Sequence, residues 1–375
     1  MKKWIVTLIA SAALVLLCGQ AASAQAGQAV TSPLEAADAY AEELKTDRLE
    51  DALPDDARDL LGNFSVSDAT NPKKGLGTLL SALGGRARQA LTAGLKNAIV
   101  VMLTALLCGM LTASFDNAGR YAVLAGVLAI SMLSIQNVGS FVGLGREVLN
   151  ELNLFTKALL PTLTSAAAAS GAVTSAAAKY AAAALFMDIL MTASHNIVIP
   201  IIYAFTATSV AEAALGGEGL TGASNLLKWL GKTTMSFIML LFVAYLSITG
   251  VISASTDAAA VKAMKTTIQT VLPVVGSIIA DASDTVLAGA QILRNAIGVF
   301  GFIAVAATCA GPFIVVGVHY LAYKAAAGLA ASASDGRITK LIANVSAAFG
   351  MILGLIGCSA LMLYISIISV IRMVS

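Results

Sequence analysis

Charged side chains are scarce in this sequence. Only 12% of its 375 residues are Asp, Glu, Lys or Arg, whereas 58% are hydrophobic and the mean hydropathy is +0.85. A soluble domain carries about 25% charged residues, so this chain has too few to cover a water-exposed surface of its size. Several apolar runs approach the roughly 20 residues that cross a bilayer as a helix. The composition predicts an all-α, polytopic helical membrane protein with about six to eight membrane segments.

Metal-binding and redox motifs are also missing. The four cysteines form no C-x-x-C pair, and all lie in apolar runs, where thiols usually behave as small hydrophobic groups. The two histidines, His195 and His319, have no partner at a spacing that would make a metal pair. We therefore expect no metal, no cofactor and no disulfide framework. The net charge of +2 indicates no particular partner, and we expect no nucleic acid.

The charges that are present divide the chain into regions. Residues 25–96 hold 11 acidic and 8 basic side chains, and the rest of the chain is much more apolar. Ahead of them, Lys2 and Lys3, an apolar stretch and a small-residue site ending at Ala24 are typical of a cleavable signal sequence. An uncleaved signal anchor is the alternative, and both would export residue 25 onward. The predicted organisation is a signal peptide (1–24), a polar, helical extracytoplasmic region (25–96) and a polytopic membrane domain (97–375).

Local signals outline helices in the polar region. Ser32-Pro33-Leu34-Glu35 has a capping serine, a proline at the first helical position and a capping-box glutamate, which predicts a helix to about Leu44. A second short helix is expected over 54–61, closed by Gly62. We expect both helices to be exposed and to pack on a partner or on the membrane domain.

Residues 73–96 alternate basic side chains with leucines. This pattern fits a basic amphipathic helix on anionic headgroups, or a solvated helix packed on the protein. The charge pattern does not decide the orientation in the membrane.

The expected membrane segments differ in character. Residues 158–178 are almost all small, which predicts a buried or re-entrant helix rather than a lipid-facing one. Gly139-x-x-x-Gly143 and Gly350-x-x-x-Gly354 are spacings that let helices approach closely, within the chain or between copies. The clearer apolar spans are 98–115, 121–143, 180–206, 233–254, 293–322 and 342–371.

A few polar residues in the apolar region are candidate functional positions. Asp188 and His195 lie seven residues apart, close to two helical turns, so they share a face; a packed, neutral histidine is the alternative. Arg294 is a further candidate. None of these residues completes a recognisable catalytic motif.

The segment 255–294 contains two aspartates, Asp281 and Asp284, in apolar surroundings. On a helical wheel they fall opposite the apolar stripe, while Pro273 and Gly276 are expected to bend the segment. We interpret it as one long, kinked amphipathic segment at a membrane surface or lining an aqueous space. A proton relay through the two carboxylates is the alternative.

Two stretches resemble a known family. "LPVVGSIIADASDTVLAGAQILRNAIGVFGF" (272–302) is similar to the signature region of the stage III sporulation protein AE family, and "LLPTLTSAAAASGAVTSAA" (159–177) is similar to a second family block. The resemblance implies a protein of the mother-cell membrane around the forespore, encoded with other stage III sporulation A-operon proteins. With these and a forespore-side partner, such proteins help build a channel or feeding-tube complex. The family has no established catalytic residues to carry over.

Two functions of different classes follow. The first is a non-enzymatic, multi-pass subunit of that sporulation channel or secretion complex, needed for late forespore development. The second is a stand-alone secondary transporter or permease, suggested by the weakly hydrophobic segment 158–178 and by proline-broken spans. Membrane lipid is an expected partner in either case, and a homo-oligomer is left open.

Overall fold

Helices make up nearly all of the computed structural model. It describes residues 32–62, 64–70, 72–114, 116–271 and 276–372, and it contains no strand within these ranges. The N-terminal helices are α2 (Pro33–Glu43), α3 (Asp47–Asp51), α4 (Asp55–Leu61) and the short 3-10 helix η1 (Asp68–Thr70). The long helices are α5 (Pro72–Ser114), α6 (Asp116–Ala169), α7 (Val173–Ala193), the π-helical segment η2 (Ser194–Val198), α8 (Ile199–Leu215), α9 (Glu218–Val271), α10 (Gly276–Ala330) and α11 (Gly336–Ile371).

Six helical stretches within the described residues are long and apolar enough to cross a membrane, which agrees with the polytopic prediction. They are Lys73–Ser114, Tyr121–Ala169, Val173–Leu215, Glu218–Ile248, Asp284–Ala330 and Gly336–Ile371. At 1.5 Å per residue, α11 is about 54 Å long and α10 about 82 Å, against a hydrocarbon core of about 30 Å. The helices therefore extend well beyond the thickness of a bilayer.

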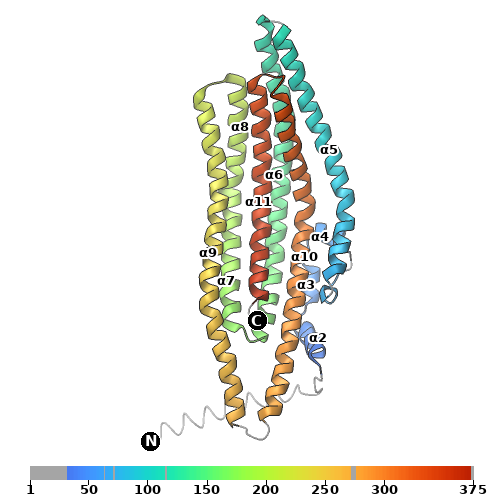
Figure 1. The fold of residues 1–375 in the computed structure, drawn as a ribbon, viewed down its shortest axis with the longest axis vertical. Coiled ribbons are helices and arrows are strands. Elements are labelled where there is room, and N and C mark those ends of the chain that lie inside the picture. The colour runs from blue at the N-terminus through green and yellow to red at the C-terminus, as the bar shows by residue number, and fades with distance from the viewer. Residues whose placement is uncertain (1–31, 63, 71, 115, 272–275, 373–375) are drawn as a thin grey trace.

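The long helical stretches lie side by side, and successive stretches alternate in direction, with α7, η2 and α8 together forming one of them (Figure 1). Both α10 and α11 lie inside the bundle. In their most apolar 18-residue stretches, 61% and 56% of the residues are buried, compared with 22% for α5. The outer face of α5 exposes many large apolar side chains, as expected of a surface that contacts lipid or a partner. Helix α10 contacts α11, α5, α6 and the N-terminal α2, so it is the central element of the fold.

The two predicted N-terminal helices, α2 and α4, begin and end close to the expected residues, whereas α3 and η1 were not predicted. Ser32 and Glu35 form the reciprocal capping box, with the Glu35 amide donating to Ser32 Oγ at 3.3 Å and the Ser32 amide donating to Glu35 Oε2 at 3.1 Å. Helix α4 ends at Gly62, whose φ of +59° is a left-handed conformation that favours glycine.

These helices pack on the membrane domain, one of the two expected alternatives. Gly289 of α10 faces α2 so closely that an added Cβ would lie 2.4 Å from Ala36 Cβ. Phe64 stacks on Phe300 of α10 with ring centroids 6.1 Å apart. The N-terminal region is therefore part of the bundle and lies beside the lower part of α10 in Figure 1.

Residues 73–96 form the first half of α5 and continue without a break into the first span. Arg86 Nη1 lies 3.2 Å from Asp56 Oδ1 of α4, and Gly94 packs against Val318 of α10. The structure thus supports a helix packed on the protein rather than a separate helix lying on the headgroups. The predicted domain boundary at residue 96 falls inside α5 and stays a prediction.

The prediction of a single helix over 158–178 is wrong, and the segment is buried only in part. Helix α6 ends at Ala169, Gly171 adopts φ +95°, and α7 begins at Val173. Glycine allows this left-handed turn without a steric clash. The segment is therefore a helix–turn–helix connection between two spans, with Ser170 in its turn only 2% exposed and Val173 beside the turn 61% exposed.

The prediction of one kinked helix over 255–294 is also wrong. Helix α9 ends at Val271, α10 begins at Gly276, and the two run antiparallel (Figure 1). Pro273, between them, lies outside the described residues. A helical wheel assumes one axis and one direction, so the pattern calculated across both helices does not describe a common face.

Candidate functional site

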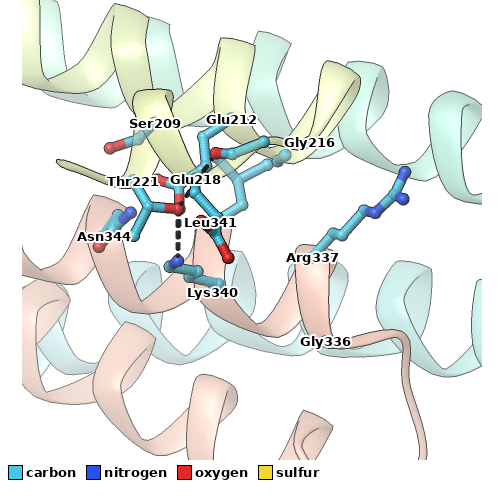
Figure 2. Close-up of a pocket in the computed structure, with 12 residues that line it drawn as sticks. Ser209, Glu212, Gly216, Glu218, Thr221, Gly336, Arg337, Lys340, Leu341 and Asn344 are labelled. Carbon is cyan, nitrogen blue, oxygen red and sulfur yellow. Dashed lines mark hydrogen bonds and ion pairs between the residues drawn. The ribbon is translucent and has the colours of Figure 1, made fainter. Parts of the chain in front are cut away.

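A buried carboxylate lies where α8, α9 and α11 meet. Glu212 of α8 is 6% exposed and forms an ion pair with Lys340 of α11. Thr221 Oγ1 of α9 donates to Glu212 Oε1 at 2.5 Å, and Lys340 Nζ donates to Thr221 Oγ1 at 3.1 Å (Figure 2). The three side chains form a closed polar triad that joins three helices.

Two local features bring these residues together. Gly216 and Gly217, at φ +73° and +115°, make a two-residue turn from α8 into α9, so Thr221 in the second turn of α9 lies over Glu212. Asp335 caps α11 by accepting from the Arg337 amide at 2.8 Å, which starts this helix one turn before Lys340. Glycine is required at the turn because other residues rarely adopt these angles.

A cavity of about 340 Å³ adjoins the triad. Its wall includes Glu212, Thr221 and Lys340 together with Ser209 and Asn344 (Figure 2). A buried carboxylate paired with an amine and a hydroxyl can hold helices in register, and it can exchange its partner for a small cationic or hydrogen-bonding group. The geometry therefore favours a polar contact that holds the three helices together and that a small molecule could reach only from the cavity.

The sequence-based predictions did not include Glu212 or Lys340. One signal was available: Glu212 is the single acidic residue between Asp188 and Glu218, inside an otherwise apolar run. Its partner could not be deduced, since Lys340 is more than a hundred residues away in the chain.

Arg294, predicted as a functional position, is the buried residue that joins the two family-like blocks. It is 3% exposed, and its Nη1 donates to Ser170 Oγ at 3.1 Å. Gly301, about two helical turns further along α10, packs on Leu159. A Cβ added to Gly301 would lie 2.8 Å from both methyl groups of Leu159. Residues of the stretches 272–302 and 159–177, far apart in sequence, thus meet where α10 packs against the end of α6 and the α6–α7 turn.

Asp188 and His195 lie in the described part of the chain, and no hydrogen bond or ion pair joins them. Asp188 is exposed on α7, and His195 is half-buried in the π-helical segment η2. The functional role of the two residues stays a prediction. His319, in contrast, is a packed histidine: Nδ1 lies 2.8 Å from the Val315 carbonyl and Nε2 lies 3.4 Å from Asn97 Nδ2. In the tautomer with its proton on Nδ1, the ring donates to the Val315 carbonyl and accepts from the Asn97 amide.

The remaining predicted positions have different environments. Asp284 is exposed near the start of α10, while the surroundings of the Asp281 side chain lie outside what the structure describes. Gly350 packs against Tyr320 of α10 and Gly354 faces Met235 of α9, so this glycine spacing serves packing within the chain. Gly139 and Gly143 of α6 have open space around them. Gly276 is the first residue of α10.

The described residues contain no group of three His, Cys, Asp or Glu side chains placed to hold a metal ion. No candidate catalytic residue follows from the contacts above. The Glu212–Thr221–Lys340 triad and the Arg294–Ser170 contact are two polar contacts that the fold assembles from residues far apart in the chain.

Comparison with known proteins supports the resemblance. The family model described as stage III sporulation protein AE matches residues 56–374. The stage III sporulation protein AE of Bacillus subtilis (strain 168) is 24% identical over 247 residues, which cover 66% of this chain and 61% of that protein. The match thus spans less than two thirds of the relative's length. No solved structure matches the chain. Because the family model covers most of the sequence, including both blocks that meet at Arg294 and Ser170, the chain belongs to the stage III sporulation protein AE family.

Proposed function

We propose that this chain is a non-enzymatic, multi-pass membrane subunit of the channel or secretion complex that joins mother cell and forespore. In this proposal it lies in the mother-cell membrane around the forespore and is needed for late forespore development. Its partners would be the other stage III sporulation A-operon proteins and a forespore-side protein. The observation that carries the proposal is the family match over residues 56–374.

The architecture suits a structural subunit. Polar side chains inside the bundle are used to join helices, as in the Glu212–Lys340 and Arg294–Ser170 contacts. The N-terminal helices are held on α10, while α5, α6 and α9 expose large apolar side chains along the outside of the bundle. Such surfaces are available to lipid or to other membrane subunits.

Deletion of the gene tests the proposal. We expect normal vegetative growth, completed engulfment and a loss of heat-resistant spores, since the complex would act only after engulfment. Complementation with the full chain should restore spore yield. A normal yield of heat-resistant spores from a clean deletion would show that the proposal is wrong.

A secondary transporter is the second candidate. Its support is the π-helical segment Ser194–Val198, which contains His195 and interrupts the α7–α8 span; such irregular turns are frequent at functional sites. Affinity purification from sporulating cells separates the two candidates. A channel subunit should copurify with other proteins of its operon, and a stand-alone transporter should not.

A further inference from the structure

A groove with a basic end and an apolar end runs along α10 and α11. Its basic end is a cavity of about 800 Å³ whose wall includes Lys228 and Lys232 of α9 and Lys324 of α10. It continues into an apolar cavity of about 450 Å³, because both cavities share Phe313, Gly357 and Leu361 in their walls. The long dimension of the groove therefore follows the helix axes.

The basic end brings together three cations without an acid. No acidic side chain is among the described residues that line the two cavities, and none of the three lysines forms an ion pair within the described part of the chain. Lys228 and Lys232 lie one helical turn apart in the span Glu218–Ile248, and Lys324 lies in the span Asp284–Ala330. Cations in membrane segments usually have an anionic partner or reach the headgroup level.

Lys324 is held in place at this end. Its Nζ donates to Tyr320 Oη at 3.3 Å and lies 5.5 Å from the centre of the Tyr320 ring. Tyr320 in turn packs on Gly350, and its carbonyl accepts from Ser346 Oγ at 2.9 Å. The glycines of α11 thus leave room for the groove, while the Tyr320–Ser346 contact fixes α10 against α11.

The groove is long enough for a lipid headgroup at its basic end and an acyl chain along its apolar end. Its wall includes Cys309, Phe313, Ile314, Ala360 and Tyr364. From Lys324 to Ala306, eighteen residues along α10 correspond to about 27 Å at 1.5 Å per residue. One leaflet contributes about half of the roughly 30 Å hydrocarbon core, so the groove accommodates a headgroup and a chain of leaflet length.

We propose that this groove binds an anionic phospholipid, with its phosphate between Lys228, Lys232 and Lys324 and an acyl chain along Phe313, Leu361 and Tyr364. Charge complementarity and the change from polar to apolar lining select a lipid over a free anion, which would leave the apolar end empty. A bound lipid would contact α9, α10 and α11 at once, because it would fill the groove that the side chains of these helices leave open.

Lipid retention by the purified full-length chain in detergent tests this proposal. Native mass spectrometry should show phosphatidylglycerol retained in preference to phosphatidylcholine, and glycerol phosphate should not displace it. The triple variant Lys228→Gln, Lys232→Gln and Lys324→Gln should bind phosphatidylglycerol about a hundredfold more weakly, since each lysine near an anionic headgroup contributes roughly a factor of five. Equal retention of the two lipids by the unmodified chain would overturn the proposal, whatever the variant does.

A matched control and a second readout complete the experiment. We chose Lys73, Lys157 and Lys262 because all three are exposed and lie outside the groove. Replacing them with Gln changes the net charge equally and should leave retention unchanged.

Cys358 lines the groove and is half-buried, whereas Cys108 and Cys309 are buried. Phosphatidylglycerol should protect Cys358 from a maleimide, and phosphatidylcholine should not. Loss of a dimer in the groove variant with unchanged lipid retention would instead identify a second copy as the occupant and overturn the proposal.

Discussion

Arg294 Nη1 of α10 donates a hydrogen bond to Ser170 Oγ in the turn between α6 and α7, over a distance of 3.1 Å. Both residues are almost completely buried. The contact joins the two stretches by which the family resemblance is seen. A guanidinium in this environment depends on its hydrogen-bond partners, because a buried charge is stabilised mainly by such contacts.

Ser170→Ala should therefore destabilise the chain. Removing one partner of a buried, charged donor costs about 1–3 kcal/mol, and the thermal midpoint in detergent should fall accordingly. Ser332→Ala is the control, since Ser332 is exposed and its hydroxyl donates to the nearby Leu329 carbonyl at 2.9 Å. An unchanged midpoint for Ser170→Ala would mean that the contact contributes nothing to stability.

The Glu212–Lys340 pair should behave as a coupled unit. Lys340→Met leaves the buried Glu212 carboxylate uncompensated and should lower stability by up to about 3–5 kcal/mol. Glu212→Gln leaves a lysine that is 47% exposed and should cost less. The double variant should recover much of the loss, which a double-mutant cycle on thermal or denaturant unfolding measures. Lys74→Met, at the Lys74–Asp68 pair, is the control and should change stability little, because the Lys74 side chain is 62% exposed. Strictly additive losses would show that Glu212 and Lys340 do not interact.

Gly289→Val should detach the N-terminal helices from α10. The added Cβ would lie 2.4 Å from Ala36 Cβ and 2.9 Å from the Pro33 carbonyl oxygen, and backbone atoms cannot move aside easily. Limited proteolysis should then cleave between α2 and α4 faster than in the unmodified chain. Gly328→Val, on the same helix with open space around it, provides the matched control. Equal cleavage rates in both variants would argue against this packing.

Asp284 should be accessible to water-soluble reagents. In a background without the native cysteines, Asp284→Cys should react with a membrane-impermeant thiol reagent offered from the correct side, whereas Ala290→Cys, at a position with 0% exposure, should not. Asp284→Asn should then have only a modest effect on spore yield. A proton relay predicts the opposite: no labelling, and complete loss of function in Asp284→Asn with normal protein levels.

The amino-acid sequence by itself determined the class of protein and the local features of its helices. Low charge and long apolar runs require a helical membrane protein, because backbone groups in lipid must be satisfied within helices. Ser32, Glu35 and Gly62 define helix ends through contacts within a few residues, so they could be predicted and are confirmed. The family was also recognisable from two short blocks.

Only the tertiary structure decided where the chain reverses and which distant residues meet. The turn at Gly171 and the antiparallel arrangement of α9 and α10 overturned two predictions of single helices, because the periodicity of a helix carries no information on where its axis changes direction. Lys340 and Ser170 became partners of Glu212 and Arg294 through packing of helices far apart in sequence. Such pairings depend on the whole bundle, since each helix fixes only its own faces and the neighbours decide which face is buried.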